Sequence, residues 1–196
     1  MRGHHLVVFP LTAALALFAC GGGSGAPECG TPEGAAVSDA DAYAAFTAAI
    51  QKDYTANSVT VIRAQAAYDD DKDPGYIGTI LKDASAEAQA DFIKNNTDLS
   101  KTWYDAKFPL TSYEMLCAEK YDYFATGDRW DAFYEAYKGA QGILSLSAAG
   151  YNAAKDEAVI YLRNIVSATR GEGYFVILKK EAGSWNTKYR VRTWQQ

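Results

Sequence analysis

Histidine is nearly absent from this sequence of 196 residues, and its absence excludes two classes of chemistry. Both histidines, His4 and His5, lie at the start of the chain, ahead of an apolar run. The rest of the sequence therefore offers no base for a Ser-His-Asp or Cys-His catalytic arrangement, and no histidine ligand for zinc or iron. We assign no catalytic residue and expect no metal ion or other cofactor.

An excess of positive charge is also missing. The chain has 19 basic and 24 acidic residues, which gives a net charge of -5 at pH 7. Nucleic-acid-binding domains are normally basic, so we expect no nucleic-acid partner. Hydrophobic residues make up 48% of the chain and aromatic residues 13%, which is ample material for a folded core.

Long hydrophobic runs are limited to one segment near the N-terminus. Residues 6–19 are apolar, follow Arg2, and are interrupted by Pro10. A helix of this length spans about 21 Å, which is less than the ~30 Å hydrocarbon core of a bilayer. A positive charge followed by a short apolar run is typical of a secretory signal. We therefore expect residues 1–19 to be a signal peptide and not a transmembrane helix.

The end of this run, Leu17-Phe18-Ala19-Cys20, is followed by a Gly/Ser segment and resembles the lipobox of bacterial lipoproteins. The resemblance implies cleavage before Cys20, a diacylglycerol on its thiol and a palmitate-type acyl chain on its amine. Two such lipid groups give stable membrane anchoring. Gly21 carries no acidic retention signal, so we expect the cell envelope, at the outer membrane where two membranes are present. The alternative is an ordinary cleaved signal peptide.

Cysteine is scarce, and lipidation of Cys20 leaves only Cys29 and Cys117. Two cysteines outside a CxxC motif are too few for a thiolate metal cluster. An even pair in an oxidising compartment favours a disulfide between Cys29 and Cys117. The alternative is that Cys117 packs as a small apolar residue and Cys29 is free.

Composition divides the mature chain into a tether and one domain. Residues 20–37 are rich in Gly, Pro, Ser and Ala, which is typical of a flexible linker. Residues 38–196 have the length of a single domain. Their patterns predict helices over 38–54, 85–95 and 128–139, and strands over 58–66 and 113–118. From residue 142 onward, alternating runs separated by turn residues predict an antiparallel meander.

These elements predict an α+β fold. We expect about three helices to pack on one face of a mainly antiparallel sheet that ends in a C-terminal β-meander.

The stretch DDDKDPG has acidic residues at alternating positions, Asp69, Asp71 and Asp73, as in a calcium loop. Pro74 displaces the glycine that such a loop requires, and Ile80 stands where a bidentate glutamate belongs. The pattern therefore favours a solvated acidic turn, with a weak calcium site as the alternative.

Three later segments, WDAFYEAYKGAQGILSLSAAGYN, EAVIYLRN and GEGYFVILKKEAGSW, resemble a loose group of bacterial secreted proteins of uncharacterised function. The chain end is also similar to that of nuclear-transport-factor-like domains, in which a hairpin finishes near a tryptophan. These resemblances imply an α+β fold and supply no catalytic residue.

The last run of the sequence suggests a basic surface. Strict alternation would place Tyr189 and Val191 in the core and three cations on the opposite face. These cations are Lys188, Arg190 and Arg192, followed on the same face by Trp194. We expect this face to be exposed and to be the candidate surface for an anionic envelope polymer or protein. The alternative is a solvated face that discourages pairing between sheet edges.

Three functional classes remain after these exclusions. The first is a membrane-anchored, non-enzymatic envelope lipoprotein with a binding or structural role. The second is a small-ligand or glycan binder that uses the 14 tyrosines and four tryptophans, since aromatic rings stack on sugars. The third is a hydrolase that works with a pair of carboxylates.

Overall fold

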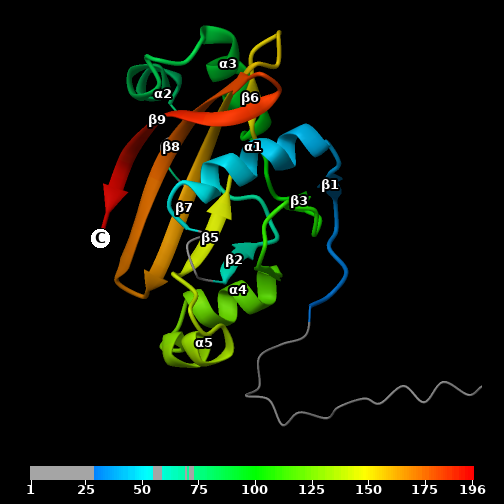
Figure 1. Cartoon of the computed structure of the whole chain (residues 1–196). Helices are drawn as coiled ribbons and strands as arrows, with labels where there is room; N and C mark the ends of the chain where they lie inside the picture. Colours follow the sequence, from blue (N-terminus) through cyan, green and yellow to red (C-terminus); the bar gives the residue numbers. More distant parts are fainter. Residues whose placement is uncertain (1–28, 55–58, 69, 71–72) are drawn as a thin grey trace, which may run out of the picture.

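The computed structural model describes residues 29–54, 59–68, 70 and 73–196 (Figure 1). The helices are α1 (Ala40–Gln51), α2 (Pro74–Ile80), α3 (Ala86–Asn95), α4 (Ala118–Ala125) and α5 (Trp130–Ala136). The strands are β1 (Ala35–Val37), β2 (Thr60–Arg63), β3 (Thr102–Tyr104), β4 (Tyr113–Leu116), β5 (Ile143–Leu146), β6 (Gly150–Tyr151), β7 (Glu157–Ser167), β8 (Arg170–Glu181) and β9 (Ser184–Gln195).

The fold is α+β, but the described residues form five helices and not about three. Two short helices were missed. Helix α2 begins directly after Asp73, whose side chain accepts a hydrogen bond from the backbone of Tyr76, with Pro74 in the first turn. Helix α4 begins after Cys117, whose side chain forms no capping hydrogen bond. The sequence there lacks the usual signal for the start of a helix, so it predicts only the strand over 113–118 and not the helix that follows.

The main sheet is mixed, and our expectation of a mainly antiparallel sheet is wrong. Its strands follow the order β4-β2-β5-β7-β8-β9, with β6 beside β7. Strand β2 runs parallel to both β4 and β5, while β5, β7, β8 and β9 pair antiparallel. Parallel neighbours need long crossovers, and here the crossovers carry the four helices after α1. A separate parallel pair joins β1 to β3.

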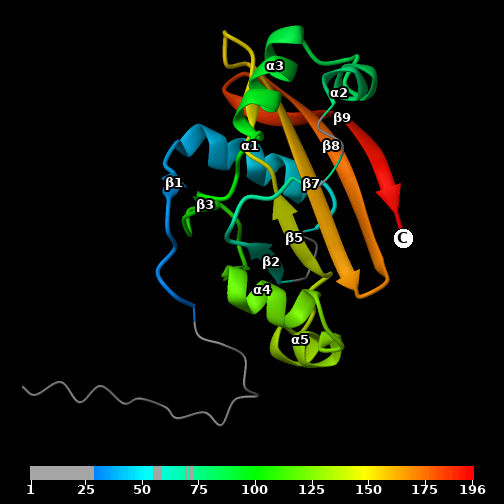
Figure 2. The same ribbon diagram turned by 180° about the vertical axis from the view of Figure 1, so that it is seen from behind.

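Helices cover both faces of the main sheet, which corrects the expected one-sided packing. Helix α1 packs on one face, in front of the strands in Figure 1 and behind them in Figure 2. The pairs α2–α3 and α4–α5 pack on the other face, towards opposite ends of the sheet. The reason lies in the central strands, since residues 158–162 and 175–178 are all fully buried. Strands that are apolar on both sides need cover on both sides.

Candidate functional site

The N-terminal segment 29–37, which we call the strap, is attached to the domain at two points. A disulfide joins Cys29 to Cys117 at the start of α4, and β1 pairs with β3. Between them Gly34 has a φ of 127°, and a Cβ there would lie 1.9 Å from the carbonyl oxygen of Lys101. Only glycine allows this close approach. We expected residues 29–37 to belong to the tether, but the structure makes them part of the domain.

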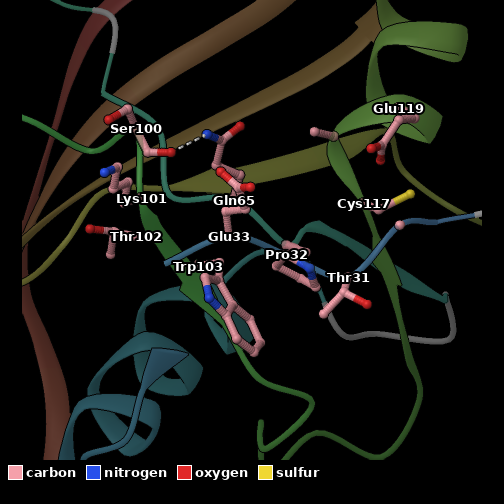
Figure 3. Close-up of a pocket in the computed structure, with 13 residues that line it drawn as sticks. Thr31, Pro32, Glu33, Gln65, Ser100, Lys101, Thr102, Trp103, Cys117 and Glu119 are labelled. Atoms are coloured by element: carbon pink, nitrogen blue, oxygen red, sulfur yellow. Dashed lines mark hydrogen bonds between the residues drawn. The ribbon is translucent and has the colours of Figure 1, made fainter. Parts of the chain in front are cut away.

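A cavity of about 270 Å³ lies beneath the strap (Figure 3), and we call it the strap cavity. Four separate parts of the chain build it: the strap, Ala64 and Gln65 after β2, the segment from Ser100 to Trp103, and the start of α4. Two carboxylates line it, Glu33 from the strap and Glu119 from α4. Gln65 stands beside them and donates a hydrogen bond to the backbone carbonyl of Ser100, 3.1 Å away. The cavity thus combines an indole ring with several hydrogen-bonding groups.

A second, more open cavity of about 280 Å³ shares Gln65 and Ser100 with the first. Its described lining is Arg63, Gln65, Ala66, Ala67, Tyr68, Leu99, Ser100 and Arg163. We call it the arginine hollow, because its charged side chains among these residues are the two arginines. Burial, together with the nearby charge of Arg63, lowers the pKa of Arg163 to about 10.

Neither cavity was foreseen in the sequence, because its residues form no motif. The one available signal was the position of the arginines. Arg63 ends the apolar run VTVI, and Arg163 ends the apolar run VIYL. A charged side chain at such a position is unusual enough to need a partner or a ligand.

The predicted basic face does not form. Bulges in the β8–β9 register, at Lys188 and at Thr193, break the alternation of β9. As a result Tyr189 pairs with Ile177 on the side of α2–α3 and is 45% exposed, whereas Arg190 pairs with Val176 on the side of α1. A bulge reverses the side on which every later residue of the strand lies.

Arg190 lies within a polar cluster against α1 and is not an exposed cation. Its side chain is only 13% exposed and forms an ion pair with Asp53. It donates a hydrogen bond of 2.9 Å to the hydroxyl of Tyr54, and its guanidinium lies 3.6 Å from the ring centre of Tyr174. Of the three predicted cations, Lys188 and Arg192 are exposed. The cluster therefore fixes β9 to the domain.

Trp194 is half-buried and packs against the sheet. Its indole N–H donates a hydrogen bond of 2.6 Å to the hydroxyl of Tyr161, and its ring covers Gly173, where a Cβ would lie 2.2 Å from the indole nitrogen. This tryptophan belongs to the face that carries α2 and α3, and the bulge at Thr193 separates it from Arg192.

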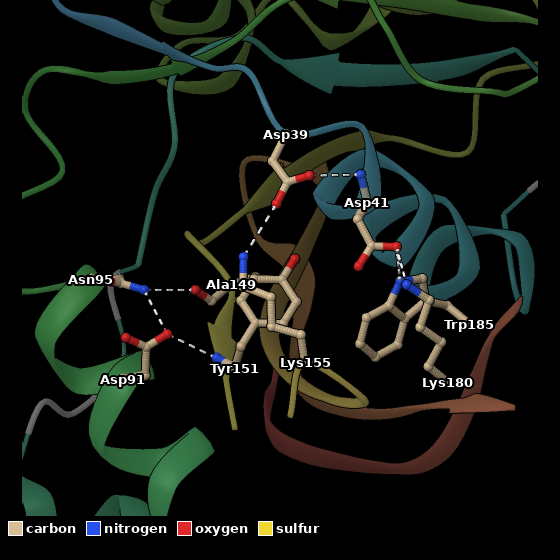
Figure 4. Close-up of polar contacts among 9 residues, drawn as sticks. All are labelled: Asp39, Asp41, Asp91, Asn95, Ala149, Tyr151, Lys155, Lys180 and Trp185. Carbon is tan, nitrogen blue, oxygen red and sulfur yellow. Dashed lines mark hydrogen bonds and ion pairs between the residues drawn. The ribbon is translucent and has the colours of Figure 1, made fainter. Parts of the chain in front are cut away.

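A polar network joins α1, α3 and the sheet at one end of the molecule (Figure 4). Asp41 accepts hydrogen bonds from Lys180 and Trp185, at 2.7 and 3.0 Å. Asp91 accepts one from the backbone of Tyr151. Burial, and then the surrounding carboxylates, raise the pKa of the Tyr151 hydroxyl. These contacts connect helices to strands, and we assign them a structural role.

The remaining predicted sites fall partly outside the described residues. Cys20, Asp69 and Asp71 lie there, so the lipid anchor and the acidic turn stay predictions. Asp73 caps α2. Within the described ranges, no group of three or more potential ligand residues is placed to hold a metal ion. In the same ranges, no helix has the length and hydrophobicity needed to span a membrane.

Comparison with known proteins gives no relative for this chain. No protein-family model matches it, and no match was found among the curated proteins or the solved structures.

Proposed function

We propose that this protein is a lipid-anchored binding protein of the bacterial cell envelope, and that it holds a small polar ligand of the glycan class in the strap cavity. The observation that carries the proposal is the cavity itself, whose strap wall is fixed at two points by the disulfide and the β1–β3 pair. A site whose walls are held in place binds without a large ordering cost.

The lining of the strap cavity matches the chemistry of a sugar. Trp103 supplies an aromatic ring, which suits the apolar face of a pyranose. Glu33 and Glu119 supply acceptors for hydroxyl groups, and Gln65 adds an amide. The volume of about 270 Å³ is near the lower end of ligand sites, so it suits one sugar ring and not a long chain.

The proposed location follows from the cysteines. Cys20 stands in a lipobox-like motif, and the Cys29–Cys117 disulfide belongs to an oxidising compartment. Residues 21–28 would then link the lipid-bearing Cys20 to the strap through a short segment rich in Gly, Ser and Pro.

The binding test uses the exposed carboxylates, because replacing them leaves the core intact. Intrinsic tryptophan fluorescence should change saturably when glucose, N-acetylglucosamine or its disaccharide is added. Glu33→Gln and Glu119→Gln should each weaken that binding by about fivefold or more, since each removes a charged acceptor. Glu181→Gln, an exposed change on β8, is the matched control and should leave binding unchanged. No saturable change with any of the three sugars would contradict the proposal.

One observation favours a second candidate, a carboxylate-based glycoside hydrolase. Glu33 and Glu119 line the same cavity, and glycoside hydrolysis uses two carboxyl groups on either side of the scissile bond. Release of p-nitrophenol from p-nitrophenyl glycosides, lost in both glutamine variants, would distinguish hydrolysis from binding.

A further inference from the structure

One wall of the strap cavity depends on the disulfide for its position. Residues 30–33 of the strap line this cavity (Figure 3), and all of them are exposed. Among the described residues they have no hydrogen-bond or ion-pair partner. They are held at their two ends, by the Cys29–Cys117 disulfide and by β1, which is three residues long. A segment with no burial or hydrogen bonds of its own has low local stability, so loss of one end attachment frees it.

The other walls of the cavity are held independently of the disulfide. Trp103 lies on β3 and forms an antiparallel bridge with Gln65, whose side chain donates a hydrogen bond to the backbone carbonyl of Ser100. Helix α4, which carries Glu119, packs into the core through Phe124. Opening of the disulfide therefore changes the strap wall and leaves the indole ring and Glu119 in place.

The disulfide is accessible to a reductant. Cys29 is exposed, and Cys117 is half-buried at the N-cap of α4. A dithiol that attacks the sulfur of Cys29 forms a mixed disulfide with it and displaces Cys117 as a thiolate, and the second thiol of the dithiol then releases Cys29. The two cysteines gain two electrons and two protons, and the dithiol becomes a disulfide.

The position of Cys117 favours this direction of attack. The backbone N–H groups at the start of a helix stabilise a thiolate, which makes Cys117 a good leaving group. Glu119, in the first turn of the same helix, opposes this effect, but its side chain is exposed and its charge is screened by solvent.

We propose that the disulfide is a redox switch of the strap cavity. A dithiol reductant with a CxxC motif opens it, residues 29–33 move away from the cavity, and the ligand held by Glu33 is released. Because β1 remains paired with β3, the opened strap stays beside the cavity and reoxidation restores the wall. This inference rests on the sugar-binding function proposed above and adds its regulation.

Cleavage by a glutamate-specific protease measures the state of the strap without any ligand. A protease needs a mobile stretch of chain, so cleavage after Glu33 should be at least about tenfold faster with dithiothreitol than in the oxidised mature chain in detergent. Mass spectrometry identifies the product that begins at Gly34. Cleavage after Glu181, which is exposed at the turn between β8 and β9, is the internal control for general unfolding and should keep its rate.

A cysteine variant tests the same step without a reductant. Cys29→Ser cannot form the disulfide, so it should show the fast cleavage after Glu33 with or without dithiothreitol. The far-UV circular dichroism spectra of this variant and of the reduced wild type should match that of the oxidised protein.

Sugar titrations connect the switch to the ligand. Reduction should weaken the binding measured by tryptophan fluorescence by about fivefold or more, as expected for the loss of Glu33 as an acceptor. In the reduced protein Glu33→Gln should cause no further loss. Glu119→Gln should still weaken binding there, because α4 keeps its position.

Three outcomes would overturn the proposal. They are equal rates of cleavage after Glu33 in the two redox states, loss of the folded spectrum on reduction, and faster cleavage with unchanged sugar affinity. Absence of sugar binding in both states would contradict the sugar-binding function instead, and the cleavage rates would still decide whether the disulfide controls the strap.

Discussion

At the scale of single residues, the environment of a charge decides its role more than its position in a pattern. Lys188 and Arg190 are two residues apart on β9, yet Lys188 is exposed and the side chain of Arg190 is largely covered by α1 and β8. The bulge at Lys188 turns Arg190 towards Asp53 and Tyr54. For a largely covered cation of this kind, the main effect on stability appears when one partner is removed, because the remaining polar groups lose their ion pair and hydrogen bond.

We therefore predict that Arg190→Gln lowers the free energy of unfolding by about 1–3 kcal/mol, because it removes the ion pair with Asp53, one of the hydrogen bonds of Tyr54 and a stacked side chain. Lys188→Gln should change it by less than about 0.5 kcal/mol. Urea unfolding followed by far-UV circular dichroism measures both. Equal midpoints for the two variants would mean that Arg190 behaves as an ordinary surface cation.

At the scale of elements, one buried carboxylate links two strands to the start of a helix. Glu157 of β7 is only 3% exposed and lies opposite Lys179 of β8, with 2.9 Å between their charged atoms. Its other oxygen accepts a hydrogen bond from the backbone of Ser85, the residue that caps α3. Burial acts to raise the pKa of Glu157, but the hydrogen bonds from Ser85 and the pair with Lys179 outweigh it, so the pKa lies below its ordinary value of 4.5.

The direction of this shift determines a pH dependence. In the unfolded chain Glu157 titrates at its ordinary pKa, whereas in the folded chain it stays ionised to lower pH. Its contribution is therefore complete above about pH 4.5 and is lost as the pH falls through the folded-state pKa. We predict that Glu157→Gln flattens the fall in unfolding free energy between about pH 5 and pH 3. Glu181→Gln on β8 is the control, and an identical acid limb in both variants would argue against the linkage.

At the scale of the whole molecule, the disulfide closes a loop that contains most of the helices. Cys29 and Cys117 are 88 residues apart in sequence, and the loop between them includes α1, α2 and α3. A cross-link over this distance restricts the unfolded chain, which corresponds to roughly 4.5 kcal/mol of stability on the chain-entropy model. It also holds the strap over its cavity.

The three cysteines should consequently separate into two independent roles. Changing both Cys29 and Cys117 to Ser should lower the free energy of unfolding by roughly 4.5 kcal/mol and leave the protein in the membrane fraction. Cys20→Ser should do the reverse, with loss of palmitate labelling and of membrane association but no change in stability. Cell fractionation and denaturant unfolding on the same variants measure both effects. Palmitate labelling that survives Cys20→Ser would contradict the anchor.

Local sequence determined the elements whose signals are short-range. The cap at Ser85 and the apolar spacing after it predict α3, and the alternating runs with turn residues predict the hairpins of β7, β8 and β9. A hydrogen bond to a nearby backbone N–H, or a periodic apolar face, depends only on neighbours along the chain. The paired cysteines likewise suggested the disulfide as one of two alternatives.

Tertiary structure alone decided the features that depend on distant partners. The parallel pairing of β2, the helices on the second face and the bulges of β9 arise from how separate segments pack, and no local pattern encodes them. The two cavities also depend on distant partners. Arg63 and Arg163, for example, lie near each other only because β5 pairs with both β2 and β7. The local sequence decides on which face of its own helix or strand a side chain lies. A site needs side chains from several elements to lie close together, and burial of the shared core decides how those elements align.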